Sequence, residues 1–479
     1  MKGLSFLELF IDGTRQPTTG EDFVDRVDPA TGRVLEARSQ LAGIDDVNRA
    51  VASARRAFPG WAATTPAERA EVLQRLSGLI LRDIDILAEM ESREVGKPIR
   101  MSRKSDLPMV ADVASFFAGA ARQLHGLAAA EYSADHTSWV RRDPVGVVAG
   151  LLPWNFPILM AAWKAFAPLA AGNAVILKPS DITPSTTLHL AELATEAGLP
   201  PGVLNIVTGR GRTVGQALAA HPGVDLVGFT GSTAGGREVM KTAAINNTRV
   251  QLELGGKAPF VVFDDADLDA AVQGAVAGTI TNAGQDCAAA TRAYVHRSLF
   301  DDFVDGVAGI LATIRLGAPL DPATEMGPLV SRKQRDSVAA AVDAARADGA
   351  TVVTGGRIPT GELADGFFYE PTLIIDATQE SDIVQEEVFG PVLVVLPFDT
   401  DEEAITLAND TAYGLVASVW TSNIRRGLNA SRAIRAGEVW INDHLPLVTE
   451  MPQGGLGASG FGKDLSVYSL EEYTVVRHI

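Results

Sequence analysis

Residues 145–154 read VGVVAGLLPW, the first of five short apolar runs that are each closed by Gly, Pro or Ser. The others are NAVILKPS (173–180), GVLNIVTG (202–209), VDLVGFTGS (224–232) and RVQLELGG (249–256). Helical patterning lies between several of them, for example over residues 184–197 and 212–220. Strands that are apolar throughout need cover on both faces, so this alternation predicts a parallel, doubly wound sheet.

A second series of similar runs follows residue 256 and predicts another α/β domain. Its members are PFVVFDD (259–265), AYVHR (293–297), TVVTGG (351–356), PTLIID (371–376), GPVLVVLPF (390–398), LVASVWT (415–421) and GEVWIND (437–443). A helical layer is also expected over residues 45–94, where apolar residues recur at helical spacing. We therefore expect an α/β fold with two doubly wound, Rossmann-like domains.

Two strand-like segments stand apart from both series. YSADHTSWVRR (132–142) and the tail YTVVRHI (473–479) are short and alternate in polarity. Such strands often pair with another element or another subunit, so we expect a small β oligomerisation arm. The expected organisation is a first domain from residues 1–125 and 145–255, a second domain from 256–445, and an arm and C-terminal tail from 126–144 and 446–479.

The composition is that of an acidic globular protein of 479 residues, 46% of them hydrophobic and 21% charged. A formal net charge of −18 argues against nucleic acid as a partner, whereas an acidic surface tolerates cationic small molecules. The single cysteine excludes an intrachain disulfide framework and is typical of a reducing cytosol. Glu8 and Asp12 fall too early for a signal peptide, and Pro153 and Pro157 would break a membrane-spanning helix over residues 144–163. We expect a cytoplasmic protein without a membrane partner.

That single cysteine, Cys287, lies in NAGQDCAAA (282–290), after an expected helix over residues 267–280. Most lone cysteines are small buried packing residues. If the Ala-rich AAATR (288–292) began a helix, the thiol at its N-terminus would have a pKa below about 8.5 and more nucleophilic thiolate at neutral pH. No HExxH, CxxC or histidine cluster predicts a metal site, and no GxSxG motif offers a serine nucleophile.

Two other polar residues lie in segments with patterns of buried structure. Asn155 interrupts the apolar run LLPWNFPILMAAWK (151–164), and burying an unpartnered amide costs about 1 to 3 kcal/mol. Its side chain is therefore either satisfied by the backbone or kept as a donor for a ligand. Glu253 lies in LELGGK (252–257), and a buried carboxylate there would have a raised pKa suited to a general base. The alternative for Glu253 is an edge-strand or ion-paired glutamate.

Loops between strands and helices offer candidate anion sites, because amides at a helix N-terminus favour anions. These loops are TGRGRTVG (208–215), with Gly211, and GFTGSTAGG (228–236), with Gly231 and Ser232. Lys178 and Asp181 follow another strand end, where such folds bind ligands, and the carboxylate could hold ribose hydroxyls while rejecting a 2′-phosphate. The structural alternatives are glycine turns and a solvated lysine beside a helix cap. GLGASG (455–460) matches GxGxxG, but no strand leads into it, so it is interpreted as a plain glycine loop.

Six motifs occur together in the order and rough spacing of one enzyme family. They are PWNFP around Asn155, LKPSD with Lys178, GFTGST, LELGGK with Glu253, GQDC with Cys287, and EEVFGPV (386–392). In this combination the chain resembles the aldehyde dehydrogenase superfamily from end to end. Its NAGQDC motif and its tail from NDHLPLVTEMPQGG onward are similar to those of bacterial γ-aminobutyraldehyde dehydrogenases. The resemblance implies an aldehyde-dehydrogenase-like fold whose first domain binds NAD and whose second domain carries the nucleophilic cysteine.

The resemblance also implies catalytic roles. Cys287 would attack the aldehyde, and the Asn155 amide and the Cys287 backbone N–H would stabilise the oxyanion. Glu253 would then activate water to hydrolyse the thioester. Val467 stands where some relatives carry a second glutamate, which leaves Glu253 as the only strong base candidate.

The implied cofactor is NAD, with no metal. Lys178 maps to the adenosine ribose, Ser232 to the pyrophosphate, and Glu387 and Phe389 to the nicotinamide ribose and ring. Asp181 stands where many relatives have a longer glutamate, and its carboxylate favours NAD over NADP. The full set of expected NAD-binding residues is Trp154, Lys178, Asp181, Gly211, Gly231, Ser232, Glu387 and Phe389.

The implied substrate is an ω-aminoaldehyde, 4-aminobutanal or its cyclic form 1-pyrroline, which would be oxidised to 4-aminobutanoate. Its ammonium group needs carboxylates or an aromatic face. The expected substrate residues are Trp163, Asp112, Asp286 and Glu450, with Asp443 as a further candidate. Alternatives are betaine aldehyde or another small aldehyde, acyl transfer to coenzyme A, and a non-catalytic protein on the same scaffold. A homo-oligomer is expected, with a tetramer favoured over a dimer.

Overall fold

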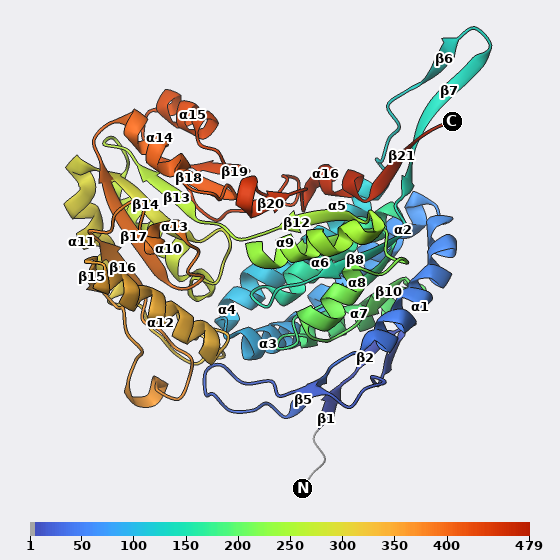
Figure 1. The fold of residues 1–479 in the computed structure, drawn as a ribbon, viewed down its shortest axis with the longest axis horizontal. Coiled ribbons are helices and arrows are strands. Elements are labelled where there is room, and N and C mark those ends of the chain that lie inside the picture. The colour runs from blue at the N-terminus through green and yellow to red at the C-terminus, as the bar shows by residue number, and fades with distance from the viewer. Residues whose placement is uncertain (1–4) are drawn as a thin grey trace.

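Two large sheets lie side by side in the computed structural model, which describes residues 5–479 (Figure 1). The first sheet has the strand order β20-β12-β11-β8-β9-β10-β2-β3. Its strands are β2 (Leu9–Ile11), β3 (Thr14–Gln16), β8 (Val147–Leu151), β9 (Ala174–Lys178), β10 (Leu204–Ile206), β11 (Leu226–Thr230), β12 (Arg249–Glu253) and β20 (Gly460–Phe461). The strands from β12 to β10 run parallel, and the outer strands pair antiparallel. The parallel sheet predicted for residues 145–256 is confirmed.

Helices cover both faces of this sheet, because its central strands are apolar on both sides. One face packs against α2, α5, α6 and α7, and the other against α1, α8 and α9. The helices of this part are α1 (Ile44–Ala62), α2 (Pro66–Arg82), α3 (Ile84–Val95), α4 (Ile99–Met101), the π-helix η1 (Ser102–Asp106), α5 (Leu107–Ala121), α6 (Pro157–Ala171), α7 (Ser185–Glu196), the π-helix η2 (Gly211–Gly215), α8 (Gln216–Ala219), α9 (Thr233–Ala243) and η3 (Ala244–Asn246).

The predicted helices of the first part are largely present. The layer expected over residues 45–94 consists of α1, α2 and α3, and the segment 184–197 forms α7. The segment 212–220 differs, because it begins as the π-helix η2 and becomes α-helical only in α8. Gly211 and Gly215 bound this π-turn, and glycine has too little helix propensity to hold a regular first turn.

The second sheet repeats the doubly wound arrangement, with the order β15-β16-β17-β14-β13-β18-β19. Its strands are β13 (Ala258–Val262), β14 (Ala290–His296), β15 (Thr351–Thr354), β16 (Thr372–Ile375), β17 (Val392–Phe398), β18 (Val416–Trp420) and β19 (Glu438–Ile441). Only β15 pairs antiparallel. Two hydrophobic clusters cover its faces. The helices are α10 (Leu268–Ile280), η4 (Thr281–Gly284), η5 (Arg297–Leu299), α11 (Phe300–Leu311), α12 (Arg332–Ala347), η6 (Gly361–Leu363), α13 (Asp382–Gln385), α14 (Asp401–Asn409) and α15 (Ile424–Ala433).

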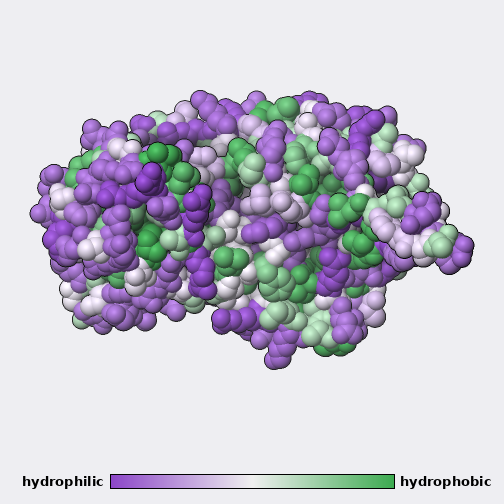
Figure 2. Space-filling model, turned by 90° about the horizontal axis from the view of Figure 1, so that it is seen from above, coloured by the Kyte–Doolittle hydropathy of each residue, from purple (hydrophilic) through white to green (hydrophobic). Residues whose placement is uncertain are grey.

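A three-stranded antiparallel arm projects from the end of the molecule that holds the first sheet (Figure 1). It consists of β6 (Ala129–Ser133), β7 (His136–Pro144) and the C-terminal β21 (Thr474–His478), so the two segments expected to form an arm pair with each other. Seen from above, the surface is mostly hydrophilic, with hydrophobic areas near the base of the arm (Figure 2). The α/β fold class with two doubly wound sheets and a small β arm is confirmed.

The C-terminal tail also contributes to the first sheet. Between β19 and the arm the chain forms η7 (Gly457–Ser459), β20 and α16 (Ser466–Glu472), and β20 pairs with β12. A small sheet of β1 (Ser5–Leu7), β5 (Ala37–Gln40) and β4 (Phe23–Val24) completes the fold. The domain boundaries proposed from the sequence stay a prediction. Within residues 5–479, no helix is both long enough and apolar enough to cross a membrane.

Candidate active site

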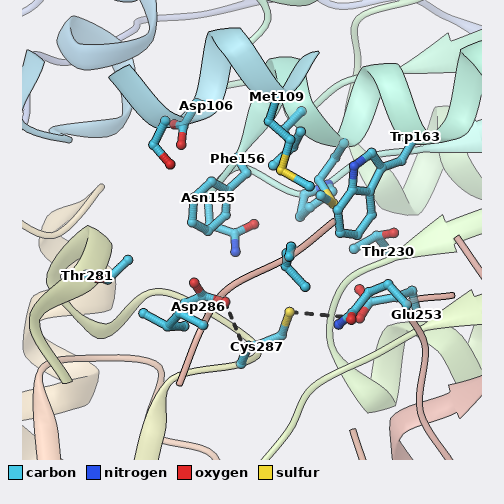
Figure 3. Close-up of a pocket in the computed structure, with 18 of the residues that line it drawn as sticks. Asp106, Met109, Asn155, Phe156, Trp163, Thr230, Glu253, Thr281, Asp286 and Cys287 are labelled. Atoms are coloured by element: carbon cyan, nitrogen blue, oxygen red, sulfur yellow. Dashed lines mark hydrogen bonds between the residues drawn. The ribbon is translucent and has the colours of Figure 1, made fainter. Parts of the chain in front are cut away.

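A cavity of about 890 Å³ lies where the two sheets meet. Its walls come from the loops after β8, β11 and β12, from the turn before β14, and from the segment 445–453. Figure 3 shows Asn155, Glu253, Asp286 and Cys287 around this cavity. The cavity therefore collects side chains from segments that are far apart in the sequence, at the carboxyl ends of parallel strands where such folds place ligands.

Cys287 lies in a tight turn between η4 and β14. Asn282 and Ala283 in η4 both have positive φ, and the turn is closed by Ala288 N–H, which donates to Asp286 Oδ1 at 2.9 Å. The expectation that a helix begins after Cys287 is wrong. The buried strand β14 begins at Ala290 instead, because the backbone of β14 pairs with β13 on one side and with β17 on the other.

The thiol environment differs accordingly from the one expected. Burial raises the pKa of Cys287 well above its ordinary value, and the carboxylates of Glu253 and Asp286 raise it further. No helix N-terminus lowers it. In the protein alone, the thiol is therefore predominantly protonated at neutral pH.

Asn155 is buried, and its side chain points toward the cysteine turn. Its Nδ2 donates to the backbone oxygen of Gln285 at 3.0 Å, and Asn282 Nδ2 donates to the backbone oxygen of Asn155 at 2.9 Å. An amide nitrogen carries two hydrogens, so one remains for a ligand. Both alternatives drawn from the sequence therefore hold, because the amide is anchored by the backbone and still has a free donor.

Glu253 is the last residue of β12 and is 2% exposed. Its Oε1 lies 3.8 Å from Cys287 Sγ, so the thiol can donate to the carboxylate (Figure 3). Burial raises the pKa of Glu253 to about 8, and the charge of Asp464 contributes to this increase. The expected buried carboxylate with a raised pKa is confirmed. The glycine loop 455–460 supports it, because Leu254 N–H donates to the backbone oxygen of Ser459 at 3.1 Å.

Sequence reasoning missed the buried ion pair of Lys164 and Asp464. Both side chains are fully buried, and Lys164 Nζ lies 2.6 Å from Asp464 Oδ2. Asp464 also accepts from Gln251 Nε2 at 3.0 Å. Lys164 lowers the pKa of Glu253 while Asp464 raises it. Val467, the position considered as a departure from relatives, is 47% exposed. The acidic group with the largest effect on Glu253 is thus Asp464, three positions earlier, and only the packing of α6 against the C-terminal tail reveals it.

Five of the expected cofactor residues line the cavity: Trp154, Gly231, Ser232, Glu387 and Phe389. Ser232 caps α9, where its hydroxyl accepts from Gly235 N–H at 3.2 Å. The Glu387 carboxyl accepts from Gly256 N–H at 2.9 Å, and burial raises its pKa to about 7. Phe389 has a φ of +56° and packs edge-on against Trp154 with ring centroids 5.3 Å apart.

The other expected cofactor residues, Lys178, Asp181 and Gly211, do not line this cavity. Lys178 is the last residue of β9, Asp181 follows three positions later, and Gly211 is the first residue of η2. Lys178 Nζ donates to the Pro179 backbone oxygen at 2.8 Å. Burial lowers the pKa of Lys178 to about 8, and the nearby Asp181 acts in the opposite direction. Gly215 at the other end of η2 approaches the Lys178 side chain, so η2 lies beside the end of β9.

Three of the four expected substrate residues line the cavity. Trp163 is 4% exposed on α6, Asp112 on α5 is exposed at the cavity mouth, and Asp286 directly precedes Cys287. Burial raises the pKa of Asp286, and the charge of Asp106 adds to this effect. Glu450 differs from expectation, because it is exposed and does not line the cavity. It accepts at 3.3 Å from the Thr449 hydroxyl, which also donates to Asp112 at 2.8 Å. The further candidate Asp443 does not line the cavity either.

A buried charge cluster behind the cavity was also missed. Asp106, at the end of η1, lines the cavity and bonds the fully buried Lys97, which lies 3.0 Å from Glu91. The Lys97 ammonium sits 4.4 Å from the ring centroid of Phe156, another lining residue. The π-turn shifts Asp106 out of regular helical spacing, so periodicity in the sequence could not place it on this face.

The raised pKa of Cys287 makes a testable prediction. Without cofactor, we expect the rate of iodoacetamide alkylation, measured by mass spectrometry, to keep rising from pH 7 to pH 9, because only the thiolate reacts. The Glu253→Gln substitution removes the negative charge that Glu253 gains as it ionises near pH 8, so alkylation should become faster toward pH 9 and change little at pH 7. A rate in the wild-type protein that levels off below pH 8 would contradict this electrostatic description.

Comparison with known proteins places this geometry in one family. The family model described as "Aldehyde dehydrogenase family" matches residues 15–479. PnpE from Pseudomonas sp. WBC-3 shares 42% identity over 98% of this chain and 96% of its own, with a TM-score of 0.97, and its structure has also been solved with nicotinamide adenine dinucleotide. An NAD+ complex of aldehyde dehydrogenase from Bacillus cereus shares 40% identity (99% and 96% covered, TM-score 0.96).

A third solved structure is betaine aldehyde dehydrogenase from Staphylococcus aureus in complex with NAD+. It shares 38% identity over 100% of this chain and 95% of its own, with a TM-score of 0.97. The family match covers the second sheet, the arm, all the residues around the cavity, and the first sheet except β2 and the first residue of β3. The chain belongs to the aldehyde dehydrogenase family.

Proposed function

We propose that the protein oxidises an ω-aminoaldehyde, 4-aminobutanal or 1-pyrroline, to 4-aminobutanoate with NAD. The observation that carries the chemistry is the 3.8 Å approach of Glu253 Oε1 to Cys287 Sγ inside the cavity. A thiol nucleophile beside a carboxyl of raised pKa supports both formation and hydrolysis of a thioester.

The first step is attack on the aldehyde carbon by Cys287 in its thiolate form, after the thiol has lost its proton to solvent. A C–S bond forms and the carbonyl oxygen becomes an oxyanion. The second Nδ2 hydrogen of Asn155 and the backbone N–H of Cys287 donate to this oxygen. Removing one such donor typically costs about 3 to 4 kcal/mol of transition-state stabilisation. Because Gln285 O already holds the Asn155 amide at 3.0 Å, the donor is oriented before the aldehyde arrives.

Bound NAD would supply the hydride acceptor for the thiohemiacetal carbon, and this oxidation would leave a thioester on Cys287. Three features of the chain fit this cofactor. The Lys178 ammonium has three hydrogens, of which Pro179 O takes one at 2.8 Å, so two remain for ribose hydroxyls beside Asp181. Gly211, Gly231 and Ser232 present backbone amides to a pyrophosphate. Glu387, Phe389 and Trp154 line the same cavity as Cys287 and would hold the nicotinamide ribose and ring.

Hydrolysis completes the cycle. Glu253 takes a proton from water, the resulting hydroxide attacks the thioester carbon, and the C–S bond breaks. The carboxylate product leaves and Cys287 is regenerated as a thiol or thiolate. Glu253 can act as a base only when ionised, and its pKa of about 8 therefore places the acid limb of the deacylation rate near that pH.

Removing either member of the Lys164–Asp464 ion pair should shift the pKa of Glu253, in opposite directions for the two residues. Asp464→Asn removes a negative charge, lowers the pKa of Glu253 and should move the acid limb of kcat to lower pH. Lys164→Met removes a positive charge and should move it to higher pH. The measurement is kcat against pH at saturating aldehyde and NAD, with circular dichroism to verify folding, because breaking a buried pair destabilises by about 3 to 5 kcal/mol. Shifts in the same direction would contradict the assignment of this limb to Glu253.

The charges around the cavity support a cationic aldehyde. Five acidic residues and one basic residue, Lys104, line it. Asp112 at the mouth accepts one hydrogen bond from Thr449 and has further lone pairs for an ammonium group. Asp286 also lines the cavity, and its Oδ1 accepts from Ala288 N–H at 2.9 Å. A primary ammonium with three N–H donors matches these carboxylates better than a neutral aldehyde does.

Betaine aldehyde is the second candidate. A quaternary ammonium has no N–H donors and is recognised by aromatic faces. Trp163 and Phe156 line the cavity, and a betaine aldehyde dehydrogenase is among the similar proteins. One face of Phe156 is already in contact with the Lys97 ammonium, which leaves fewer free aromatic faces for such a substrate.

A substrate panel tests this proposal. We expect kcat/KM for 4-aminobutanal to exceed that for pentanal, its neutral counterpart of matched length, by at least about tenfold. Asp112→Asn should lower kcat/KM for 4-aminobutanal about 5- to 30-fold, as loss of roughly 1 to 2 kcal/mol of charge-assisted bonding would do, and leave pentanal unchanged. Asp443→Asn, outside the cavity, is the matched control. Preference of the wild-type enzyme for pentanal would exclude an ammonium site, and preference for betaine aldehyde would favour the second candidate.

We also propose a cytoplasmic homo-oligomer, with a tetramer favoured, assembled through the arm. Tyr132, Trp139 and Val476 on the arm are 67%, 44% and 64% exposed. Apolar side chains on exposed strands are typical of surfaces that pair with another subunit.

A further inference from the structure

His444 is a buried polar side chain to which the proposed chemistry gives no role. It lies just after β19, is 6% exposed, and packs between the rings of Phe260 (centroids 5.6 Å apart) and Trp440 (4.9 Å). Gly278 of α10 closes the site, because any Cβ at that position would lie 2.7 Å from the His444 ring. The imidazole is therefore enclosed by three elements of the second sheet and its helices, behind the nucleophile.

The hydrogen bonds of His444 determine its protonation. Nε2 lies 2.9 Å from the backbone oxygen of Ala288, and Nδ1 lies 3.1 Å from the Ser418 hydroxyl. A carbonyl oxygen only accepts, so Nε2 carries the hydrogen and donates, and Nδ1 accepts from Ser418. Burial lowers the pKa of His444 to about 4, which keeps this neutral tautomer across the physiological range.

The carbonyl that His444 holds belongs to the residue after the nucleophile. Asp286 Oδ1 already accepts from Ala288 N–H at 2.9 Å, and Ala289 N–H donates to Asp286 O at 3.1 Å. His444 adds a bond from outside this turn. The orientation of the turn sets the direction of the Cys287 backbone N–H, the proposed oxyanion donor. The His444 bond is thus one residue removed from the reacting centre.

The residues that follow His444 in the chain form one wall of the cavity. Leu445, Pro446, Leu447 and Thr449 line the cavity. Asn442 and Leu445 on either side of His444 have φ values of +56° and +81°, a region that costs non-glycine residues roughly 1 to 3 kcal/mol each. Such a loop persists only when neighbouring contacts hold it. Leu445 packs in one apolar cluster with Ala288 and Cys287, and Asp443 Oδ1 accepts from His444 N–H at 2.8 Å.

We propose that His444 is a positioning residue that ties the cavity wall 445–449 to the turn carrying Cys287. Its Nε2–H holds the Ala288 carbonyl and thereby sets the attack geometry of Cys287 and the direction of the oxyanion donor. The role rests on the proposed nucleophile and is independent of which aldehyde is the substrate. Because it acts on the geometry of acylation, its loss slows hydride transfer at saturating substrate and leaves NAD affinity unchanged.

The test compares His444→Phe, which keeps an aromatic ring but cannot donate, with His444→Gln, whose amide can donate to Ala288 O. The measurements are single-turnover NADH formation with enzyme in excess, and the dissociation constant of NAD. We expect His444→Phe to slow NADH formation at least about tenfold, because small misplacements near a reacting centre are costly, and to leave the NAD dissociation constant within about twofold. His444→Gln should recover to within about threefold of wild type, and His296→Phe, on β14 of the same sheet, should match wild type.

A normal rate of NADH formation in folded His444→Phe, or a Gln variant as slow as the Phe variant, would overturn the proposal. If His444→Phe does not fold, Ser418→Ala serves instead, because it removes the hydroxyl that fixes the tautomer. We expect it to slow NADH formation about threefold, and an unchanged rate would equally overturn the proposal. Failure of the nucleophile assignment itself is distinguishable, because Cys287→Ser would then retain turnover.

Discussion

The constraint on which the site depends is the burial of a carboxyl and a thiol against each other. Glu253 ends a strand of the first sheet and Cys287 precedes a strand of the second, and their side chains meet at 3.8 Å. Low solvation raises the pKa of both groups, so each is predominantly protonated in the protein alone. The same low solvation strengthens every donor aimed at a developing charge, which is the condition for oxyanion stabilisation by Asn155.

Hydrogen bonds and a buried ion pair hold the polar groups around Glu253 and Cys287 in place. Lys164 and Asp464 act on Glu253 with opposite signs from behind, and the backbone of the cysteine turn is bonded by Asn155 and Asn282 from one side and by His444 from the other. Substrate and cofactor therefore enter a region whose dipoles are already oriented. Asp112 lines the same cavity but is exposed, and in our proposal it contributes to the choice of aldehyde.

Much of this arrangement was predictable from sequence. Continuous apolar strands alternating with helices predicted both sheets, and the buried Glu253 and Asn155 were visible as polar residues in apolar runs. The pKa of Cys287 was predicted in the wrong direction, because the Ala-rich segment after it favours a helix locally while pairing with β13 and β17 makes it a strand. The two buried ion pairs were not predictable. Lys164 and Asp464 meet only through long-range packing, and a π-turn places Asp106 beside Lys97. Glu450 was misplaced because the sequence does not show which residues of segment 445–453 face the cavity, and Thr449 lines it whereas Glu450 does not.

The most direct test of the central claim is a pre-steady-state measurement of NADH formation by the Glu253→Gln variant. If Glu253 is the base for thioester hydrolysis, acylation and hydride transfer proceed without it. NADH should then appear in a burst of about one equivalent per site, followed by slow turnover as the thioester accumulates. A uniform slowing with no burst would show that Glu253 acts before hydride transfer, and would contradict the assignment of Cys287 and Glu253 to successive halves of the reaction.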